Sequence, residues 1–385
     1  MPRFPARALS ILSLFAATAA IPAAAGPLPP PPPLAAKGWV LLDATSGRIL
    51  AGQNDTERLE PASLTKLMTS YVVFHALKEG KLRLEQEVPV SEHAWRVGGA
   101  KSDGSTSYLP IHSNVKVVDA IQGMIVQSGN DATIVLAEAI AGTEQTFAVM
   151  MNQYSQQLGM KGTHWTNTAG LPDPQHYTTA RDVAILGAAL VREFPEYYKW
   201  FSQREFTYNH IRQFNRNGLL DRDPTVDGIK TGHTEAAGFC LASSALRDGM
   251  RLVSVVMGTA SPKAREDASE TLLGYGFNFF ETKRLYSAGQ RIGQATVYKT
   301  SDPVPVVVHG DLYSTAPRGE LAGARAQLLL NPRLTAPLAA SAPVGRLKVT
   351  LGDAVLAEVP VYPAAAVEPG NIFRRLIDTV RLWFA

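Results

Sequence analysis

A serine and a lysine three residues apart, Ser63 and Lys66, stand immediately before an apolar run that begins at Leu67. The helical spacing of that run, and Pro61 at its entry, predict that Ser63 opens a helix. Residues three apart lie on one helix face, so the Lys66 amine can reach the Ser63 hydroxyl. A neighbouring base turns a serine hydroxyl into a good nucleophile. The pair therefore predicts acyl transfer through Ser63, and an inert surface pair is the simplest alternative.

Two further short motifs favour the catalytic interpretation. A Ser-Gly-Asn motif at 128–130 begins 65 residues after Ser63, and a Lys-Thr-Gly motif at 230–232 begins 102 residues after Ser128. Each motif alone is a common turn or strand end. The motifs stand at a predicted helix start, an inter-helix turn and a strand end. In that order, S-x-x-K, S-x-N and K-T-G are typical of penicillin-interacting serine enzymes.

The side chains of the second and third motifs match the steps of acyl transfer. The Ser128 hydroxyl can pass a proton to a departing amine. The Asn130 amide can donate to a peptide group and accept from it, and so hold a substrate backbone. Lys230 and the Thr231 hydroxyl suit a substrate carboxylate. Together these residues predict a peptide substrate with a free carboxyl end.

Backbone groups complete the predicted site. Gly232 permits an acyl chain to approach the strand edge and bind by β-augmentation. The backbone N–H groups of Ser63 and His233 are candidates for holding the oxyanion. Which residue accepts the serine proton is disputed for penicillin-interacting serine enzymes. Our hypothesis is that Lys66 is this base.

The elements that must position these motifs form an α+β pattern. An apolar hairpin (38–43 and 48–52) precedes the Ser63 helix, which should end near Gly80. The other predicted helices span 119–126, 132–141, 147–158, 181–191 and 265–280, and the predicted strands span 205–211, 226–231, 238–245 and 250–258. Helices set against an antiparallel sheet in this way predict one α+β domain over residues 36–282.

The first 25 residues have the pattern of a secretory signal. Arg3 and Arg7 form a basic start, an apolar core spans 8–20, and three alanines at 23–25 offer a cleavage site. An uncleaved anchor is the alternative, but the apolar run is short for a membrane span. Five consecutive prolines within 26–35 predict an extended spacer. We therefore expect an exported protein.

Charge and cysteine content exclude several other classes of function. Without Arg3 and Arg7 the formal net charge falls from +3 to +1, which argues against a nucleic-acid partner. The single cysteine, Cys240, rules out an intrachain disulfide and is expected to be a small buried residue. No group of His and Cys has metal-ligand spacing, so we expect no metal and no other cofactor.

The last hundred residues predict two further units. Short β-branched runs at 296–298, 304–308, 347–351 and 355–361 predict a small all-β, sandwich-like domain over 283–366. Residues 368–385 are expected to form an amphipathic helix with Phe373, Ile377 and Trp383 on its apolar face. It is too short to span a bilayer. Its terminal position, aromatic residues and positive charge favour a place in the membrane interface over docking on its own domain.

The chain resembles a known family, the low-molecular-mass penicillin-binding proteins that are D-alanyl-D-alanine carboxypeptidases of the bacterial envelope. The likeness covers almost the whole chain after the signal, with extended matches at 61–71, 127–132, 206–220 and 226–234. It implies a penicillin-recognising, β-lactamase-like serine fold. It also implies removal of the terminal D-alanine from the peptidoglycan pentapeptide stem, and covalent inhibition by β-lactams. Arg216 would help to recognise the terminal carboxylate, and the last helix would hold the enzyme on the periplasmic face of the inner membrane.

Two departures from related patterns bear on the activity. The segment 98–107 is small and polar and predicts a mobile loop, and its part 101–107 is more polar than the corresponding rim loop of the family. Between Asn130 and Lys230 there is no Glu-x-x-Leu-Asn element of class A β-lactamases. Without that glutamate, efficient release of a penicilloyl group is not expected, so a β-lactamase is disfavoured.

Two other functions remain open at this point. A DD-endopeptidase that cuts peptidoglycan crosslinks would use the same site. A non-catalytic wall-binding scaffold would have lost a motif residue, and every motif residue is present.

Overall fold

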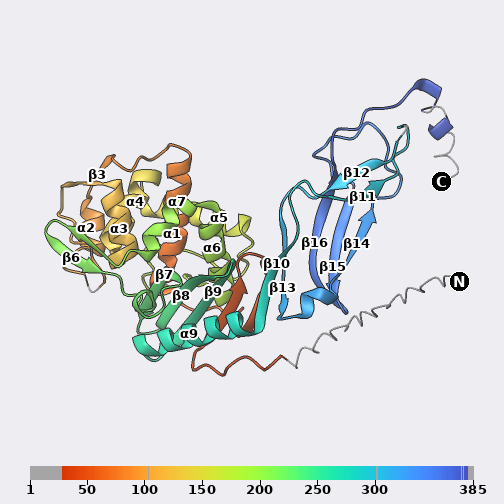
Figure 1. The fold of residues 1–385 in the computed structure, drawn as a ribbon. Helices are drawn as coiled ribbons and strands as arrows, with labels where there is room; N and C mark the ends of the chain where they lie inside the picture. Colours follow the sequence, from red (N-terminus) through yellow and green to blue (C-terminus); the bar gives the residue numbers. More distant parts are fainter. Residues whose placement is uncertain (1–27, 103, 301, 374, 376, 380–385) are drawn as a thin grey trace, which may run out of the picture.

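The computed structural model describes residues 28–102, 104–300, 302–373, 375 and 377–379. The predicted signal segment and residues 380–385 of the predicted terminal helix lie outside that part of the chain. The described residues form an N-terminal α+β domain and a C-terminal β domain, joined by a two-stranded ribbon (Figure 1). The predicted α+β fold class is confirmed.

A five-stranded antiparallel sheet in the order β2-β1-β9-β8-β7 organises the first domain. Its strands are β1 (Gly38–Asp43), β2 (Ile49–Gln53), β7 (Val226–Thr234), β8 (Gly238–Arg247) and β9 (Met250–Thr259). The predicted hairpin β1–β2 is present, and β1 also pairs with β9 from the far end of the domain. Strand β7 hydrogen-bonds only to β8 and therefore forms an edge of the sheet.

Alternating residues of β1 enter two separate cores, one on each face of the sheet. Val40 and Leu42 join the larger core, which contains helix α1 (Thr65–Lys78). Trp39 and Leu41 pack on the other face among residues of helix α9 (Pro262–Phe279). Because both faces are covered, all six residues of β1 are buried, as its continuous apolar run predicts.

A block of helices packs on the side of the sheet that faces α1 (Figure 1). Thr143, Thr179 and Ser261 each cap a helix N-terminus with a side-chain oxygen. The remaining helices are α2 (Glu92–Gly98), α3 (Val117–Gln122), α4 (Asn130–Ala141), α5 (Glu144–Gln157), α6 (Ala180–Glu193), α7 (Pro195–Tyr198) and α8 (Leu219–Arg222). The helices predicted at 132–141, 147–158, 181–191 and 265–280 are confirmed, with bounds that agree to within three residues.

Three predictions of local structure need correction. Ser63 lies in a 3-10 turn, Ala62–Leu64, and α1 proper begins two residues later. The helix predicted over 119–126 is α3 followed by a π-helical segment, Gly123–Gln127. The strand predicted over 205–211 is a hairpin of β5 (Glu205–Tyr208) and β6 (Ile211–Phe214). The two residues between these strands have positive φ angles, the geometry of tight hairpin turns.

The C-terminal domain is all β, as predicted. Strand β10 (Phe280–Tyr286) continues directly from α9, spans the predicted boundary at 282/283, and pairs with β13 (Leu312–Pro317). This ribbon packs on a five-stranded sheet through apolar residues that include Leu312, Val306 and Val361. The sheet has the order β11 (Arg291–Ala295), β12 (Val304–Val307), β16 (Ala354–Pro363), β15 (Gly345–Leu351) and β14 (Arg325–Leu330).

A further short ribbon in the first domain joins β3 (Glu87–Pro89) to β4 (Asn114–Lys116).

Two other sequence expectations concern burial and membrane segments. Cys240 is fully buried in β8, and burial raises the pKa of its thiol to about 11. Within the described residues, no single helix is long and apolar enough to cross a bilayer; α4 and α5 pass that test only as a pair bent by 83°.

Candidate active site

Ser63 is presented by a strained turn at the entrance to the buried helix α1. The preceding residue, Ala62, has a φ of +48°, which L-residues other than glycine rarely adopt. Its carbonyl oxygen accepts a 2.8 Å hydrogen bond from Thr65 Oγ1 and packs against Gly170, where a Cβ would lie 1.8 Å from that oxygen. Only glycine fits at residue 170, and its lack of a side chain lets the loop between α5 and α6 pack directly against the turn that carries Ser63. Ser63 thereby lines a cleft of about 750 Å³.

Lys66 is the buried centre of the site. Its Nζ lies 3.1 Å from Ser63 Oγ, 2.7 Å from Asn130 Oδ1 and 2.7 Å from the carbonyl oxygen of Ala169. The side chain is 1 % exposed. Desolvation, with help from the charge of Arg216, lowers the pKa of Lys66 from 10.5 to about 7. The amine is therefore substantially neutral near neutral pH.

The three contacts of Lys66 can be made by the neutral amine as well as by an ammonium. An uncharged lysine has two N–H donors and one lone pair, whereas an ammonium has three donors. In the neutral form that the lowered pKa favours, Asn130 Oδ1 and the Ala169 carbonyl, which can only accept, take the two N–H bonds. The lone pair then faces Ser63 Oγ, which can both donate and accept. The geometry therefore equips Lys66 to remove the Ser63 proton.

The second motif lines the same cleft as Ser63. Ser128 has a φ of +67°, at the point where the π-helical segment ends and α4 is about to begin. Its Oγ is buried, lines the cleft, and has no hydrogen-bond partner among the described residues. The neighbouring Asn130 opens α4, and its side-chain oxygen accepts from Lys66. The Ser128 hydroxyl is thus free to transfer a proton within the cleft.

The third motif lies on the edge strand β7. Thr231, Gly232 and His233 line the cleft, and Lys230 is 3 % exposed beside them. Burial, with the charges of Lys66 and two arginines, holds the pKa of Lys230 well below its usual value. Within the part of the chain that the structure describes, Lys230 has no carboxylate partner. A substrate carboxylate would supply one and favour its charged form.

Close packing against the Ser63 turn explains why residue 232 is a glycine, and the sequence alone did not reveal this reason. A Cβ at this position would lie 3.0 Å from the Pro61 carbonyl oxygen and 3.3 Å from Ala62 Cβ. The glycine therefore lets β7 pack against the turn that carries Ser63. The next residue, His233, stacks its ring on Phe239 at 4.0 Å.

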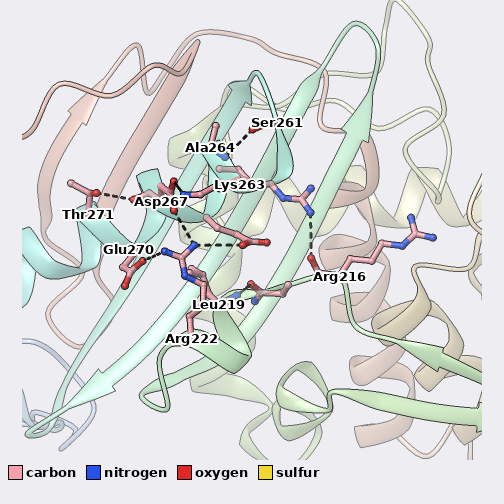
Figure 2. A network of polar contacts seen from close by, with 12 residues as sticks. Arg216, Leu219, Arg222, Ser261, Lys263, Ala264, Asp267, Glu270 and Thr271 are labelled. Atoms are coloured by element: carbon pink, nitrogen blue, oxygen red, sulfur yellow. Dashed lines mark hydrogen bonds and ion pairs between the residues drawn. The ribbon is translucent and has the colours of Figure 1, made fainter.

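Arg216 and Arg265 add positive charge to the same wall of the cleft. Arg216 Nη1 donates to Ser105 Oγ at 2.7 Å. Arg265 is 5 % exposed, and its guanidinium donates to the carbonyl oxygens of Gly232 and Arg216, each at 3.3 Å. Figure 2 shows the Arg216 side chain extending away from the carbonyl oxygen that receives this bond. Burial lowers the pKa of both guanidinium groups.

A polar network anchors α9 behind this wall. Arg222 on α8 pairs with Asp267 at 2.9 Å and with Glu270 on α9 (Figure 2). Lys263 pairs with Asp267 within α9. These surface contacts lie on the helix that supplies Arg265.

Gly98 ends α2, the rest of the predicted loop at 98–107 is irregular, and residue 103 lies outside the described part. Its second half is tied to the Ser-Gly-Asn turn by a fully buried carboxylate. Asp131 accepts hydrogen bonds from Ser107 N at 2.8 Å, Leu109 N at 3.0 Å and Thr106 Oγ1 at 2.9 Å. Ser105, which bonds Arg216, is thereby held at the rim of the cleft.

Sequence reasoning missed three contributors to the site. The Ala169 carbonyl is a backbone group, so no side-chain motif marks it. Arg265 lies within a predicted helix with nothing in its local pattern to show that it faces a cleft. The buried carboxylate of Glu144 accepts from Thr168 N at 2.9 Å and from Thr168 Oγ1 at 2.7 Å, and so holds the segment that carries Ala169.

The fold and the site together define a class of protein. A serine hydroxyl beside a buried lysine whose pKa is lowered, in a cleft that two arginines and a second buried lysine make positive, is the equipment of a serine acyltransferase or peptidase that acts on a carboxylate-ended peptide.

Comparison with known proteins specifies the family. Residues 26–261 match the family described as D-alanyl-D-alanine carboxypeptidase, and residues 280–369 match the C-terminal domain of penicillin-binding protein 5. The chain is 40% identical over 361 residues to the D-alanyl-D-alanine carboxypeptidase DacA of Escherichia coli K12, covering 93% of this chain and 90% of DacA. DacA of Haemophilus influenzae is 43% identical over 352 residues, covering 90% of this chain and 89% of the relative.

Solved structures agree. The crystal structure of penicillin-binding protein 5 from Haemophilus influenzae superposes with a TM-score of 0.83 at 43% identity, covering 88% of this chain and 99% of that one. The chain therefore belongs to the D-alanyl-D-alanine carboxypeptidase family, whose members are serine-type peptidases.

Proposed function

We propose that this protein removes the terminal D-alanine from peptides ending in D-alanyl-D-alanine, through an acyl-enzyme on Ser63. The Ser63 proton passes to the neutral Lys66 amine as Oγ attacks the carbonyl carbon of the penultimate residue. The C–N bond then breaks, and the departing amine takes a proton through Ser128. Water hydrolyses the resulting ester, releases the shortened peptide and restores the Ser63 hydroxyl.

One observation carries this proposal: the three contacts of Lys66. The pKa of about 7 and the two acceptors Asn130 and Ala169 leave a lone pair for Ser63 Oγ. An inert surface pair would be solvated and would keep an ordinary lysine pKa. The same geometry argues against a scaffold that has lost catalysis.

The charges of the cleft support a carboxylate-ended substrate. Thr231, Arg216 and Arg265 line the cleft, and the buried Lys230 precedes Thr231 on β7, so these groups are the proposed partners of a terminal carboxylate. The backbone N–H groups of Ser63 and His233 are the proposed oxyanion donors. The free edge of β7 offers backbone groups to the acyl side of the substrate.

β-Lactams are proposed covalent inhibitors through the same serine. Their strained amide acylates Ser63, but the leaving nitrogen stays attached and remains in the cleft. The loop residue nearest the Lys66 amine offers a carbonyl, Ala169, and the buried Glu144 is occupied by Thr168. Neither group is placed as the water-activating glutamate of class A β-lactamases, so slow release of the penicilloyl group is expected.

The proposal is tested with a synthetic pentapeptide ending in D-Ala-D-Ala and with the same peptide amidated at its C-terminus. Wild-type protein should release D-alanine from the free acid only, and Ser63→Ala should release none. Robust release by Ser63→Ala would exclude the mechanism. Faster cleavage of a crosslinked muropeptide than of the pentapeptide would favour the endopeptidase alternative.

Export and membrane attachment belong to the same proposal. The described residues Ile372 and Phe373 are 74 % and 75 % exposed and Ile377 is 49 % exposed, so the β domain leaves most of this apolar surface uncovered. Asp378 is 2 % exposed and accepts from Lys299 N at 2.8 Å, which ties the segment to the domain beneath it. We propose that the apolar face enters the interface of the inner membrane on its periplasmic side.

Flotation with vesicles tests this attachment. Protein without the signal segment should float with vesicles containing anionic lipid, and the same protein ending at residue 367 should stay in the soluble fraction. Equal flotation of the two forms would contradict a membrane role for the last helix.

A further inference from the structure

The histidine at position 176 has a set of contacts that the proposed reaction does not use. It lies in the loop between α5 and α6, is 2 % exposed, and does not line the cleft. Its Nδ1 accepts from Thr166 N at 3.0 Å, and its Nε2 lies 2.8 Å from Thr65 Oγ1. Its ring meets Trp165 edge-on at 5.4 Å. Hydrogen bonds thus connect Thr166 and His176 of this loop to Thr65, the first residue of α1.

The direction of every bond in this chain follows from the donors available. The Thr166 N–H can only donate, so Nδ1 of His176 carries no proton. A neutral imidazole then has its proton on Nε2 and donates it to Thr65 Oγ1. The Thr65 hydroxyl in turn donates to the carbonyl oxygen of Ala62 at 2.8 Å. The result is an uninterrupted, one-directional chain that ends at the residue before Ser63.

The surroundings keep the ring in this neutral form. Burial lowers the pKa of His176 to about 4. The nearby carboxylates of Asp173 and Glu144 oppose that change, and His164 and Lys66 add to it. The chain of hydrogen bonds is therefore intact at the pH values where Lys66 is neutral.

The end of the chain is the strained part of the site. Ala62 has a left-handed φ, and a conformation of that kind persists only where the surroundings fix it. Gly170 presses on the Ala62 carbonyl from one side, and Thr65 holds it from the other. The same turn sets the direction of Ser63 Oγ toward Lys66. Loss of either hold would let the turn relax and move the nucleophile.

We infer that His176 is a positioning residue for Ser63, acting through the Thr65 hydroxyl. It touches no reacting atom. It orders the turn so that Ser63 Oγ stays within reach of the Lys66 lone pair. This inference rests on the proposed role of Ser63 and adds a residue from a distant loop to the set that acylation requires.

The test uses purified full-length protein and the second-order rate of acylation by a fluorescent penicillin. His176→Phe keeps the ring beside Trp165 but can neither donate nor accept, and Thr65→Val removes only the hydroxyl. Each should slow acylation by about 10- to 100-fold, because a displaced reactive group costs rates of that order. The midpoint of thermal unfolding is measured alongside, and Thr65→Val carries the test if His176→Phe does not fold.

Rescue and coupling separate positioning from general packing. His176→Gln and Thr65→Ser each keep a donor in place and should acylate within about threefold of wild type. The double variant His176→Phe/Thr65→Val should be no slower than the slower single variant, since both break one chain. The matched control is His164→Phe, a half-exposed histidine of the same loop, which should leave the rate unchanged.

Two results would overturn the inference. One is wild-type acylation by a folded Thr65→Val or His176→Phe protein. The other is a double variant whose loss is the product of the single losses. Failure of the wild-type protein itself to acylate would instead reject the proposed function, so the two failures are distinguishable.

Discussion

At the scale of single residues, the protonation of Lys66 decides what the site can do. The pKa falls from 10.5 to about 7 because the amine is buried and lies near Arg216. Asp131 and Glu144 lie close enough to oppose this fall without reversing it. The folded protein therefore holds a lysine that loses its proton near neutral pH.

This pKa predicts the pH dependence of acylation. The base must be neutral to accept the Ser63 proton, so the active fraction falls as pH drops through 7. The second-order rate of acylation by a penicillin should decrease about tenfold per pH unit below 7 and reach a plateau above it. Stopped-flow measurements from pH 5 to pH 9 check this. A flat profile across pH 7 would show that Lys66 is not the titrating base.

Replacing the lysine tests the same assignment independently. Lys66→Arg keeps a long cationic side chain that does not lose its proton, so acylation should fall by about 10²- to 10⁴-fold. Lys161→Arg, at an exposed position of the same domain, is the matched control and should acylate like wild type. A Lys66→Arg protein within tenfold of wild type would contradict the role of the neutral amine.

At the scale of elements, the rim loop depends on one carboxylate. Asp131, on the first turn of α4, accepts two backbone N–H groups and one hydroxyl from residues 106–109. Asp131→Ala would leave these buried donors unsatisfied, which should lower the free energy of unfolding by about 3 kcal/mol. Urea denaturation measures this, with Glu138→Ala on the same helix as the control. A loss below about 0.5 kcal/mol would mean that water replaces the carboxylate.

Periodicity and local signals predicted which helices and strands form. They did not predict the backbone geometry at the ends of these elements. The apolar run after Lys66 identified α1, because a buried helix needs apolar residues on most faces. It could not show that Ser63 lies in a 3-10 turn, since that depends on Gly170 from a distant loop. The left-handed Ser128 was likewise hidden, because a serine carries no mark of positive φ.

The sheet order could not be read from the sequence. Local signals predicted the hairpin β1–β2 and the run β7–β8–β9, but nothing local shows that β1 inserts between β2 and β9. That pairing joins residues more than two hundred positions apart. It is nevertheless what makes β7 an edge strand and leaves its free edge beside the cleft.

At the scale of the whole molecule, a buried carboxylate joins the two domains. Asp43 ends β1 and is fully buried; it accepts from the hydroxyls of Thr282 on β10 and Thr315 on β13. It also accepts from Thr45 N at 2.7 Å. Figure 1 shows the β10–β13 ribbon lying between the N-terminal domain and the five-stranded sheet of the C-terminal domain. The junction is thus a polar contact between the first strand and the ribbon.

This contact predicts how the domains unfold. Asp43→Ala removes the shared acceptor, so the domains should unfold in two separate calorimetric transitions instead of one, with about 2 kcal/mol lost at the junction. Acylation should stay within about threefold of wild type, since the cleft lies at the edge strand β7, which β8 and β9 separate from β1. Asp353→Ala, in the turn before β16, is the control. A single unchanged transition would show that Asp43 does not couple the domains.

The account as a whole depends on Ser63 being the nucleophile that Lys66 activates. The most direct measurement is the intact mass of wild-type and Ser63→Ala protein after incubation with a penicillin. The account predicts one penicilloyl adduct per wild-type molecule, retained for minutes or longer, and none on Ser63→Ala. An adduct of equal amount on Ser63→Ala, or none on either protein, would contradict it.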